Sequence, residues 1–132
     1  MDIVIHEHNF EMKWNLSSYG SLWIVSPESV NEIGCIHTCQ GLELDYIGVI
    51  IGDDLVIRDG QLITNPKKRA KTDTSLKGYK KLLKTDPDSA MVKADLIIKN
   101  TYRTLLTRGM KGCYVYFTDK ETEEYFKQML NI

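Results

Sequence analysis

The sequence predicts an α/β fold in which a mostly parallel sheet is flanked by helices. Residues 46–51 form a continuous apolar run, and residues 113–117 form a second run rich in strand-forming side chains. Between them, apolar residues recur at three- and four-residue steps over residues 90–106, the period of an amphipathic helix. A strand, a helix and a second strand in this order are typical of parallel sheets.

The chain has the size and composition of one domain. Of its 132 residues, 42% are hydrophobic, which is enough for one packed core. We therefore expect residues 1–132 to form a single domain, with residues 53–89 as an insertion within it. The opening residues run directly into a strand pattern, which indicates a segment of a longer protein.

Charge and cysteine content limit the binding partners and the cellular compartment that can be expected. The formal net charge of −1 gives no global argument for a nucleic-acid or membrane partner. Three cysteines without paired spacing are typical of thiols in a reducing cytosol. No stretch approaches the roughly 20 apolar residues that span a bilayer, and the N-terminus lacks the pattern of a signal peptide. We expect a cytoplasmic protein without membrane contact.

The first third of the chain is predicted to consist of strands. Alternating apolar and polar residues predict one strand with a buried face over residues 3–14. Short apolar runs predict two further strands, at residues 22–25 and 33–36. The last of these strands leads into a turn at Gln40 and Gly41.

The middle of the chain is predicted to hold a hairpin and a polar loop. Residues 55–63 read as two short strands, with Asp59 and Gly60 at the two positive-φ positions of a tight turn. Residues 65–88 are rich in Lys, Thr, Ser and Asp, which predicts a loop. One short helix is expected within it, at residues 79–83.

The final third is predicted to be helix, strand and helix. Asp86 or Ser89 can cap the start of the central amphipathic helix. Its end is marked by Gly109, and a strand follows. Thr118 or Asp119 can then cap a second amphipathic helix that continues to the terminus.

The segment GCIHTCQGLELDY, residues 34–46, combines a glycine-containing turn with polar side chains. At the end of a buried strand in an open α/β sheet, such a turn is where ligands bind. Gly41 lets the backbone approach a phosphate, and the Glu43 carboxylate can accept hydrogen bonds from a ribose. His37 and Thr38 can donate to a phosphodiester. The alternative is that Gln40 and Gly41 form only a turn and that His37 is a core histidine.

The segment NTYRTLLTRGMKGCYVY, residues 100–116, delivers Arg108 at the last turn of a helix, just before a strand. A guanidinium there can reach a triphosphate bound on a neighbouring domain and stabilise charge during phosphoryl transfer. The ammonium group of lysine cannot reproduce the planar, forked arrangement of N–H donors on a guanidinium. The alternative for Arg108 is a cation that interacts only with the helix dipole.

Together the runs CIHTCQGLEL and TLLTRG resemble the fifth and sixth conserved motifs of superfamily-one helicases. Those motifs usually read Thr-x-His-x-x-Gln-Gly-x-Glu-aromatic and Ala-x-Thr-Arg-Ala. The chain also resembles the bacterial Schlafen-like helicase family over nearly its whole length, including WNLSSYGSLW, RAKTD and SLKGYKKL. It departs from the usual pattern at Cys35, Leu44 and Arg103, where threonine, an aromatic residue and tyrosine are common.

The resemblance implies a second, C-terminal RecA-like domain of the P-loop NTPase type. Such proteins bind ATP and Mg²⁺ between two RecA-like domains. When the residue roles of that family are transferred to this sequence, Arg108 is the arginine finger and Glu43 contacts the ribose. Gln40 and Gly41 line the nucleotide, and His37 touches the nucleic-acid backbone. The chain contains no Gly-x-x-x-x-Gly-Lys-Ser/Thr run, the loop that holds the phosphates of ATP. An N-terminal RecA-like domain of the same parent chain would have to supply this loop. We therefore expect that this chain alone does not hydrolyse ATP.

Residues 67–84 are strongly basic. They hold eight Lys and Arg residues against one Asp, a balance of 8 − 1 = +7. We predict that Lys67, Lys68, Arg69 and Lys71 bind the phosphates of a single-stranded nucleic acid, DNA or RNA. The alternative is a solvated basic loop.

Two function classes stay open. The first is the C-terminal motor half of an ATP-dependent helicase or translocase. The second is a non-catalytic module of the same fold that binds nucleic acid or docks a partner. Zinc at Cys35, His37 and Cys39 is not expected, because the spacing matches no usual zinc pattern. Nucleophilic catalysis by Cys39 is discounted because no triad partner can be placed.

Overall fold

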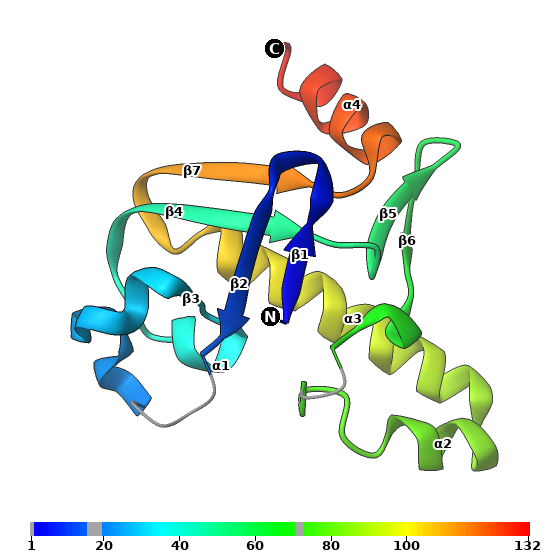
Figure 1. Ribbon diagram of the computed structural model, residues 1–132. Helices are drawn as coiled ribbons and strands as arrows, with labels where there is room; N and C mark the ends of the chain where they lie inside the picture. Colours follow the sequence, from blue (N-terminus) through cyan, green and yellow to red (C-terminus); the bar gives the residue numbers. More distant parts are fainter. Residues whose placement is uncertain (1, 16–19, 71–72) are drawn as a thin grey trace. The chain divides into compact units, whose positions relative to one another are not determined.

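The computed structural model describes residues 2–15, 20–70 and 73–132. The chain divides into two compact units, Met1–Leu42 and Glu43–Ile132. The described residues form one three-stranded sheet and two separate two-stranded sheets (Figure 1). The fold is therefore mixed α/β, as predicted, but several short sheets replace the single, mostly parallel sheet of the prediction.

The first unit opens with a hairpin. Strands β1 (Ile3–Ile5) and β2 (Phe10–Trp14) are antiparallel, with Ile3 opposite Met12. The prediction of one strand over residues 3–14 was wrong because a 3₁₀ turn and Asn9, at a φ of 48°, reverse the chain between them. The two-residue strand β3 (Glu32–Ile33) pairs in parallel with β2.

Two other predicted strands of the first unit are helical in the structure. Residues Gly20–Val25 form a 3₁₀ helix, and a second 3₁₀ helix follows at Pro27–Asn31. The strand predicted at 33–36 ends at Ile33, and α1 (Ile36–Cys39) begins instead. The cause is a local cap: the Thr38 hydroxyl accepts a hydrogen bond from the Cys35 N–H at 2.9 Å, which favours a helical turn despite β-branched side chains.

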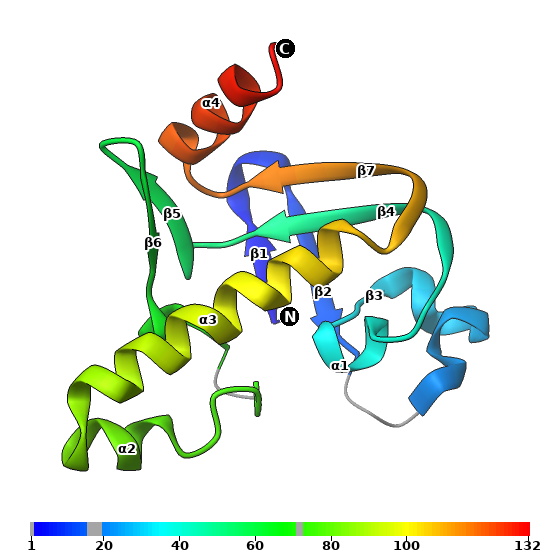
Figure 2. The same cartoon turned by 180° about the vertical axis from the view of Figure 1, so that it is seen from behind.

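The core of the second unit is a β–α–β arrangement. Strands β4 (Leu44–Ile51) and β7 (Gly109–Phe117) are parallel neighbours, and α3 (Pro87–Leu106) crosses one face of the pair (Figure 2). The following side chains form its buried cluster: Ile47, Val49, Ile51, Leu55, Ile98 and Tyr102. The predicted strand–helix–strand order is confirmed here.

Two tyrosines lie side by side on the β4–β7 pair. Tyr46 and Tyr114 are 55% and 72% exposed, with ring centroids 6.2 Å apart. Along β4 the buried residues Ile47, Val49 and Ile51 alternate with less buried ones. The apolar run in the sequence therefore includes residues of both faces of this strand.

The predicted hairpin is confirmed. Strands β5 (Leu55–Arg58) and β6 (Gln61–Thr64) are antiparallel and joined by two residues. Asp59 and Gly60 in this turn have φ values of 52° and 72°, the geometry whose twist matches that of the strands. The hairpin lies between β4 and α3 in the chain order, inside the segment predicted to be an insertion.

The remaining predicted helices are also confirmed. They are α2 (Tyr79–Thr85) and α4 (Lys120–Met129), in addition to α3. The Asp86 side chain accepts from the Ser89 N–H at the start of α3, and Asp119 accepts from the Thr122 N–H at the start of α4. Among the described residues, none of the helices combines the length and apolar character that a bilayer crossing needs.

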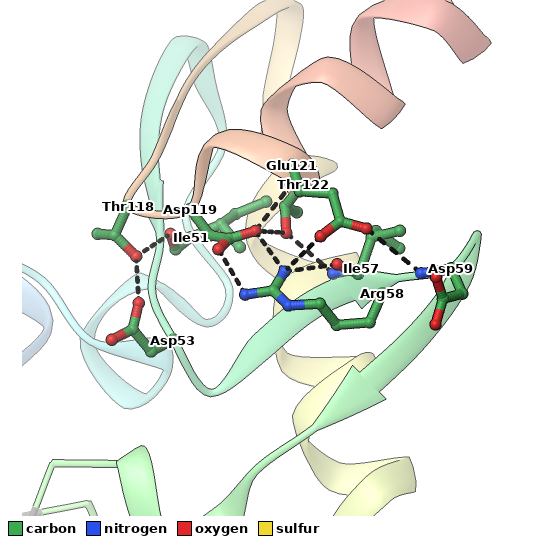
Figure 3. A network of polar contacts seen from close by, with 9 residues as sticks. All are labelled: Ile51, Asp53, Ile57, Arg58, Asp59, Thr118, Asp119, Glu121 and Thr122. Atoms are coloured by element: carbon green, nitrogen blue, oxygen red, sulfur yellow. Dashed lines mark hydrogen bonds and ion pairs between the residues drawn. The ribbon is translucent and has the colours of Figure 1, made fainter.

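A polar network joins the β5–β6 hairpin to α4 (Figure 3). Arg58 donates to both Asp119 carboxylate oxygens, at 2.8 and 2.7 Å. Thr122 donates its hydroxyl to Asp119 at 2.6 Å and accepts from the Ile57 N–H at 2.9 Å. The hydrogen bonds from Arg58 and then from Thr122 hold the pKa of Asp119 well below its usual value. The paired charge thus fixes the hairpin at the amino-terminal end of α4.

Candidate functional site

Glu43 and Arg108 are neighbours in the structure. Each directly precedes one strand of the parallel pair, and Leu44 lies opposite Gly109 in the register. The Leu44 N–H donates to the Arg108 carbonyl at 3.4 Å. Both residues therefore lie at the amino-terminal edge of β4 and β7, where the two strands enter together (Figure 1). We call this place the Glu43–Arg108 edge.

The two side chains at this edge have complementary chemistry. Glu43 is exposed and Arg108 is half-buried. Among the described residues, the Arg108 Nε is buried without a hydrogen-bond partner. An unsatisfied buried donor costs about 1–3 kcal/mol, and in this conformation the Nε is closed off from solvent. The Glu43 carboxylate can accept hydrogen bonds and the Arg108 guanidinium can donate them. The two residues that carry these groups lie on adjacent chain segments.

The predicted setting of this site needs a correction. The segment 34–46 was expected to follow a buried strand, at the carboxyl edge where ligands bind in open α/β sheets. The segment instead follows the two-residue strand β3, contains α1 and runs into β4, so Glu43 lies at the amino-terminal end of β4. The strand predicted at residues 33–36 ends at Ile33, and α1 takes the place of its remainder.

The end of α3 fixes the position of Arg108. The Thr107 hydroxyl donates to the carbonyls of Arg103 and Thr104, at 2.9 and 3.1 Å, and the Arg108 N–H donates to the Leu105 carbonyl at 3.2 Å. These bonds satisfy carbonyls that the helix end would leave open. Arg108 is therefore held in a tight turn between α3 and β7.

Gly109 lets β7 begin directly after Arg108. A Cβ atom at this position would lie 2.1 Å from the Gly112 carbonyl oxygen and 3.1 Å from the Ile47 nitrogen. The crowding comes from a bulge, because β4 advances two residues from Leu44 while β7 advances three from Gly109. Glycine at 109 is thus a geometric requirement of the Glu43–Arg108 edge.

Substituting Gly109 with alanine should destabilise this edge. We expect Gly109→Ala to lower the free energy of unfolding by about 1–3 kcal/mol, because backbone atoms must move to admit the methyl group. Gly48→Ala is the matched control in the same strand pair, since a Cβ there meets nothing within 4 Å. Chemical denaturation of both variants measures the difference. Equal stability of the two would contradict the packing argument.

The predicted residues His37, Thr38, Gln40 and Gly41 lie together in the first unit, in α1 and the turn after it. His37 and Gln40 are exposed. The Thr38 hydroxyl is engaged in the cap of α1, where it also donates to the Cys35 carbonyl at 3.0 Å. Gly41 has a φ of 82°, which strains any other residue. The turn therefore requires its glycine whether or not it binds a ligand.

The basic segment is less uniform than its sequence. Lys67 and Lys68 lie in a short 3₁₀ helix (Pro66–Lys68) and are exposed. Arg69 points inward instead: its Nη1 lies 3.0 Å from Asp54 Oδ2, its Nη2 contacts Asp73, and its side chain is 11% exposed. Lys71 lies outside the described residues. The guanidinium of Arg69 is thus committed inside the protein, unlike the two lysines.

Sequence reasoning missed the buried network around Asp54. The Tyr102 hydroxyl donates to Asp54 Oδ1 at 2.5 Å and accepts from the Gly52 N–H at 3.2 Å. Burial, followed by the charge of Asp54, raises the pKa of Tyr102 well above its usual value. For Arg69, burial alone would lower the pKa, but Asp54 and Asp73 raise it on balance. No sequence signal links these residues, because they are far apart along the chain.

Two comparisons with known proteins match this chain. A family model described as Schlafen group 3, DNA/RNA helicase domain, matches residues 1–119. The chain is 32% identical over 120 residues to the "Uncharacterized protein YPL245W" of Saccharomyces cerevisiae, an alignment covering 88% of this chain and 25% of that protein. The chain therefore spans about a quarter of that curated relative. No solved structure matches it.

Proposed function

Since this chain belongs to the Schlafen group 3 DNA/RNA helicase domain family, we propose that it is the C-terminal motor half of an ATP-dependent nucleic-acid helicase or translocase. The observation that carries the proposal is the Glu43–Arg108 edge, where the two motif-bearing segments enter neighbouring parallel strands. The match to a quarter of the yeast relative is consistent with a chain that works as part of a longer protein.

The nucleotide side of the proposal rests on the chemistry of that edge. Arg108 would act as the arginine finger, because its guanidinium can spread over the oxygens of a transferring phosphoryl group. Glu43 would accept hydrogen bonds from the ribose, and Gln40 and Gly41 would line the nucleotide. The role is supported by position, because Arg108 and Glu43 directly precede neighbouring parallel strands. Mg²⁺, held with ATP by an N-terminal RecA-like domain, would neutralise charge on the phosphates.

The strand side of the proposal rests on exposed groups. Lys67 and Lys68 present two ammonium groups, neither of which forms an ion pair among the described residues. They would neutralise phosphates of a single-stranded nucleic acid, and the exposed His37 would be a further donor to its backbone. Thr38 is left out, because its hydroxyl already donates to the Cys35 carbonyl. Arg69 is left out of the proposed contact, because Asp54 and Asp73 already neutralise it.

Reversing the charges of Lys67 and Lys68 should weaken strand binding. We expect Lys67→Glu with Lys68→Glu to lower affinity for all sequences alike, and to reduce the slope of log affinity against log salt by about 0.7 for each phosphate that is no longer neutralised. Fluorescence anisotropy with a labelled oligonucleotide at several salt concentrations measures both effects. Lys13→Glu with Lys120→Glu, a second double reversal at exposed positions on β2 and α4, controls for the same change in net charge. If the slope does not change, residues 67 and 68 do not contact the strand and belong to a solvated loop.

A further inference from the structure

A groove lies between α2 and α3 in the second unit. Its volume is about 300 Å³, and its floor is apolar, formed by side chains that include Leu82, Ala94 and Ile97. Ala94 is 1% exposed, so the floor is continuous with the protein interior. The volume is at the lower end of the range for small-molecule sites, enough for one planar ring system.

The rim of the groove is cationic. Lys77 and Lys81 line it from the α2 side, and Lys93 lines it from α3. All three are exposed, and none forms an ion pair among the described residues. Three unneutralised ammonium groups around an apolar floor favour a ligand that has a flat apolar body and negative charge beside it.

The surroundings of the groove favour a nucleotide over an acidic peptide. Tyr79 lines the groove with an aromatic ring, a surface on which bases stack. Four further lysines lie near it in sequence and are exposed, namely Lys67, Lys68, Lys80 and Lys84. Cations in this number suit a polyanion that continues beyond the groove, whereas a single acidic side chain would need only the three lysines of the rim.

We propose that the α2–α3 groove receives one unstacked nucleobase of the bound strand, with its flanking phosphates against Lys77, Lys81 and Lys93. The inference rests on the proposed function, because it names where the strand is held. Arg69, which precedes α2 in the chain, forms ion pairs with Asp54 and Asp73 and is therefore not counted among the cations that would bind the strand.

The test compares two strands that differ only in their bases. The 132-residue chain is titrated by fluorescence anisotropy with a labelled oligothymidine and with an abasic oligonucleotide of equal length. Base stacking contributes about 1–3 kcal/mol, so the oligothymidine should bind at least about fivefold more tightly. Thr85→Phe places a ring in the groove, because Thr85 lines it and is exposed. This variant should lose the preference while keeping its affinity for the abasic strand.

Ser89→Phe is the matched control. Ser89 is an exposed hydroxyl residue on α3 that does not line the groove, so the preference should be retained. Photo-crosslinking with a 4-thiothymidine strand gives a second readout that needs no variant: adducts should fall on residues 76–97. Crosslinks confined to other segments would overturn the assignment.

Other outcomes separate this inference from the proposed function. Equal binding of both strands by the wild-type chain, with a salt slope that still depends on Lys67 and Lys68, would overturn the groove and leave strand binding intact. Competition by free thymidine monophosphate as strong as by the oligothymidine would assign the groove to a free nucleotide. If polyglutamate displaces the oligothymidine but not the abasic strand, the groove is assigned to an acidic peptide. Binding of neither strand would overturn both proposals.

Discussion

Replacing Arg108 with alanine should lower strand-stimulated ATP hydrolysis by a factor of about 10³ to 10⁵, the range for arginine fingers. The measurement uses the full parent protein, in which an N-terminal RecA-like domain is proposed to bind ATP, with single-stranded DNA and RNA tested separately. ATP binding, followed with a fluorescent ATP analogue, should change little, because a finger acts mainly on charge that develops during the transfer.

Two companion variants make this result specific. Arg108→Lys keeps the positive charge but loses the planar fork, so it should recover only a small part of the rate. Arg103→Ala removes an exposed arginine from the last turn of the same helix and should leave the rate close to that of the wild type. If Arg103→Ala also lowers ATP hydrolysis, the effect comes from the helix end as a whole and not from the Arg108 guanidinium.

The same assay decides between the two function classes. Turnover that survives Arg108→Ala unchanged would show that the finger assignment is wrong. A wild-type protein that binds a strand tightly but never hydrolyses ATP would instead favour the non-catalytic module. In that case the Lys67 and Lys68 variants would still weaken binding, because phosphate neutralisation needs no nucleotide.

Local signals predicted the second unit well. The Asp59–Gly60 turn, the Asp86 and Asp119 caps and the period of α3 each depend on residues within a few positions of one another, so the sequence shows them directly. The adjacency of Glu43 and Arg108 is not a local signal, because it depends on the pairing of β4 with β7. That the sheet is RecA-like, and that the family member is bacterial, stay predictions.

What the sequence could not show depends on partners far apart in the chain. Arg69 reads as one more cation of a basic run, but Asp54, 15 residues earlier, draws it inward. In the first unit, Gly34 fits beneath the Trp23 ring, where a Cβ atom would lie 2.3 Å away. This contact, together with the Cys35 cap, favours helix α1 where the residues alone favoured a strand.

The largest stability effect is expected at Asp54. Its carboxylate is 5% exposed and binds both Arg69 and Tyr102. Asp54→Ala leaves the Tyr102 hydroxyl without its acceptor and removes one of the two carboxylates paired with Arg69, so the free energy of unfolding should fall by about 3–5 kcal/mol, as for other broken buried ion pairs. Asp54→Asn keeps the shape and one acceptor oxygen and should lose less.

Asp45→Ala is the control for this variant, because it also removes an aspartate from an ion pair. The pair of Asp45 with Lys111 is 2.8 Å long, but both side chains are more than 60% exposed, so about 1 kcal/mol or less is expected. A loss for Asp54→Ala no larger than for Asp45→Ala would contradict the buried network.

The choice of probe matters because the chain has two compact units. Both tryptophans, Trp14 and Trp23, belong to the first unit, whereas Asp54 and the three longest helices belong to the second. Urea unfolding followed by far-ultraviolet circular dichroism therefore reports mainly on the unit that Asp54→Ala weakens. A tryptophan transition that moves with it would show that the two units unfold cooperatively. A tryptophan transition that stays in place would show that the damage is confined to the unit carrying the Glu43–Arg108 edge.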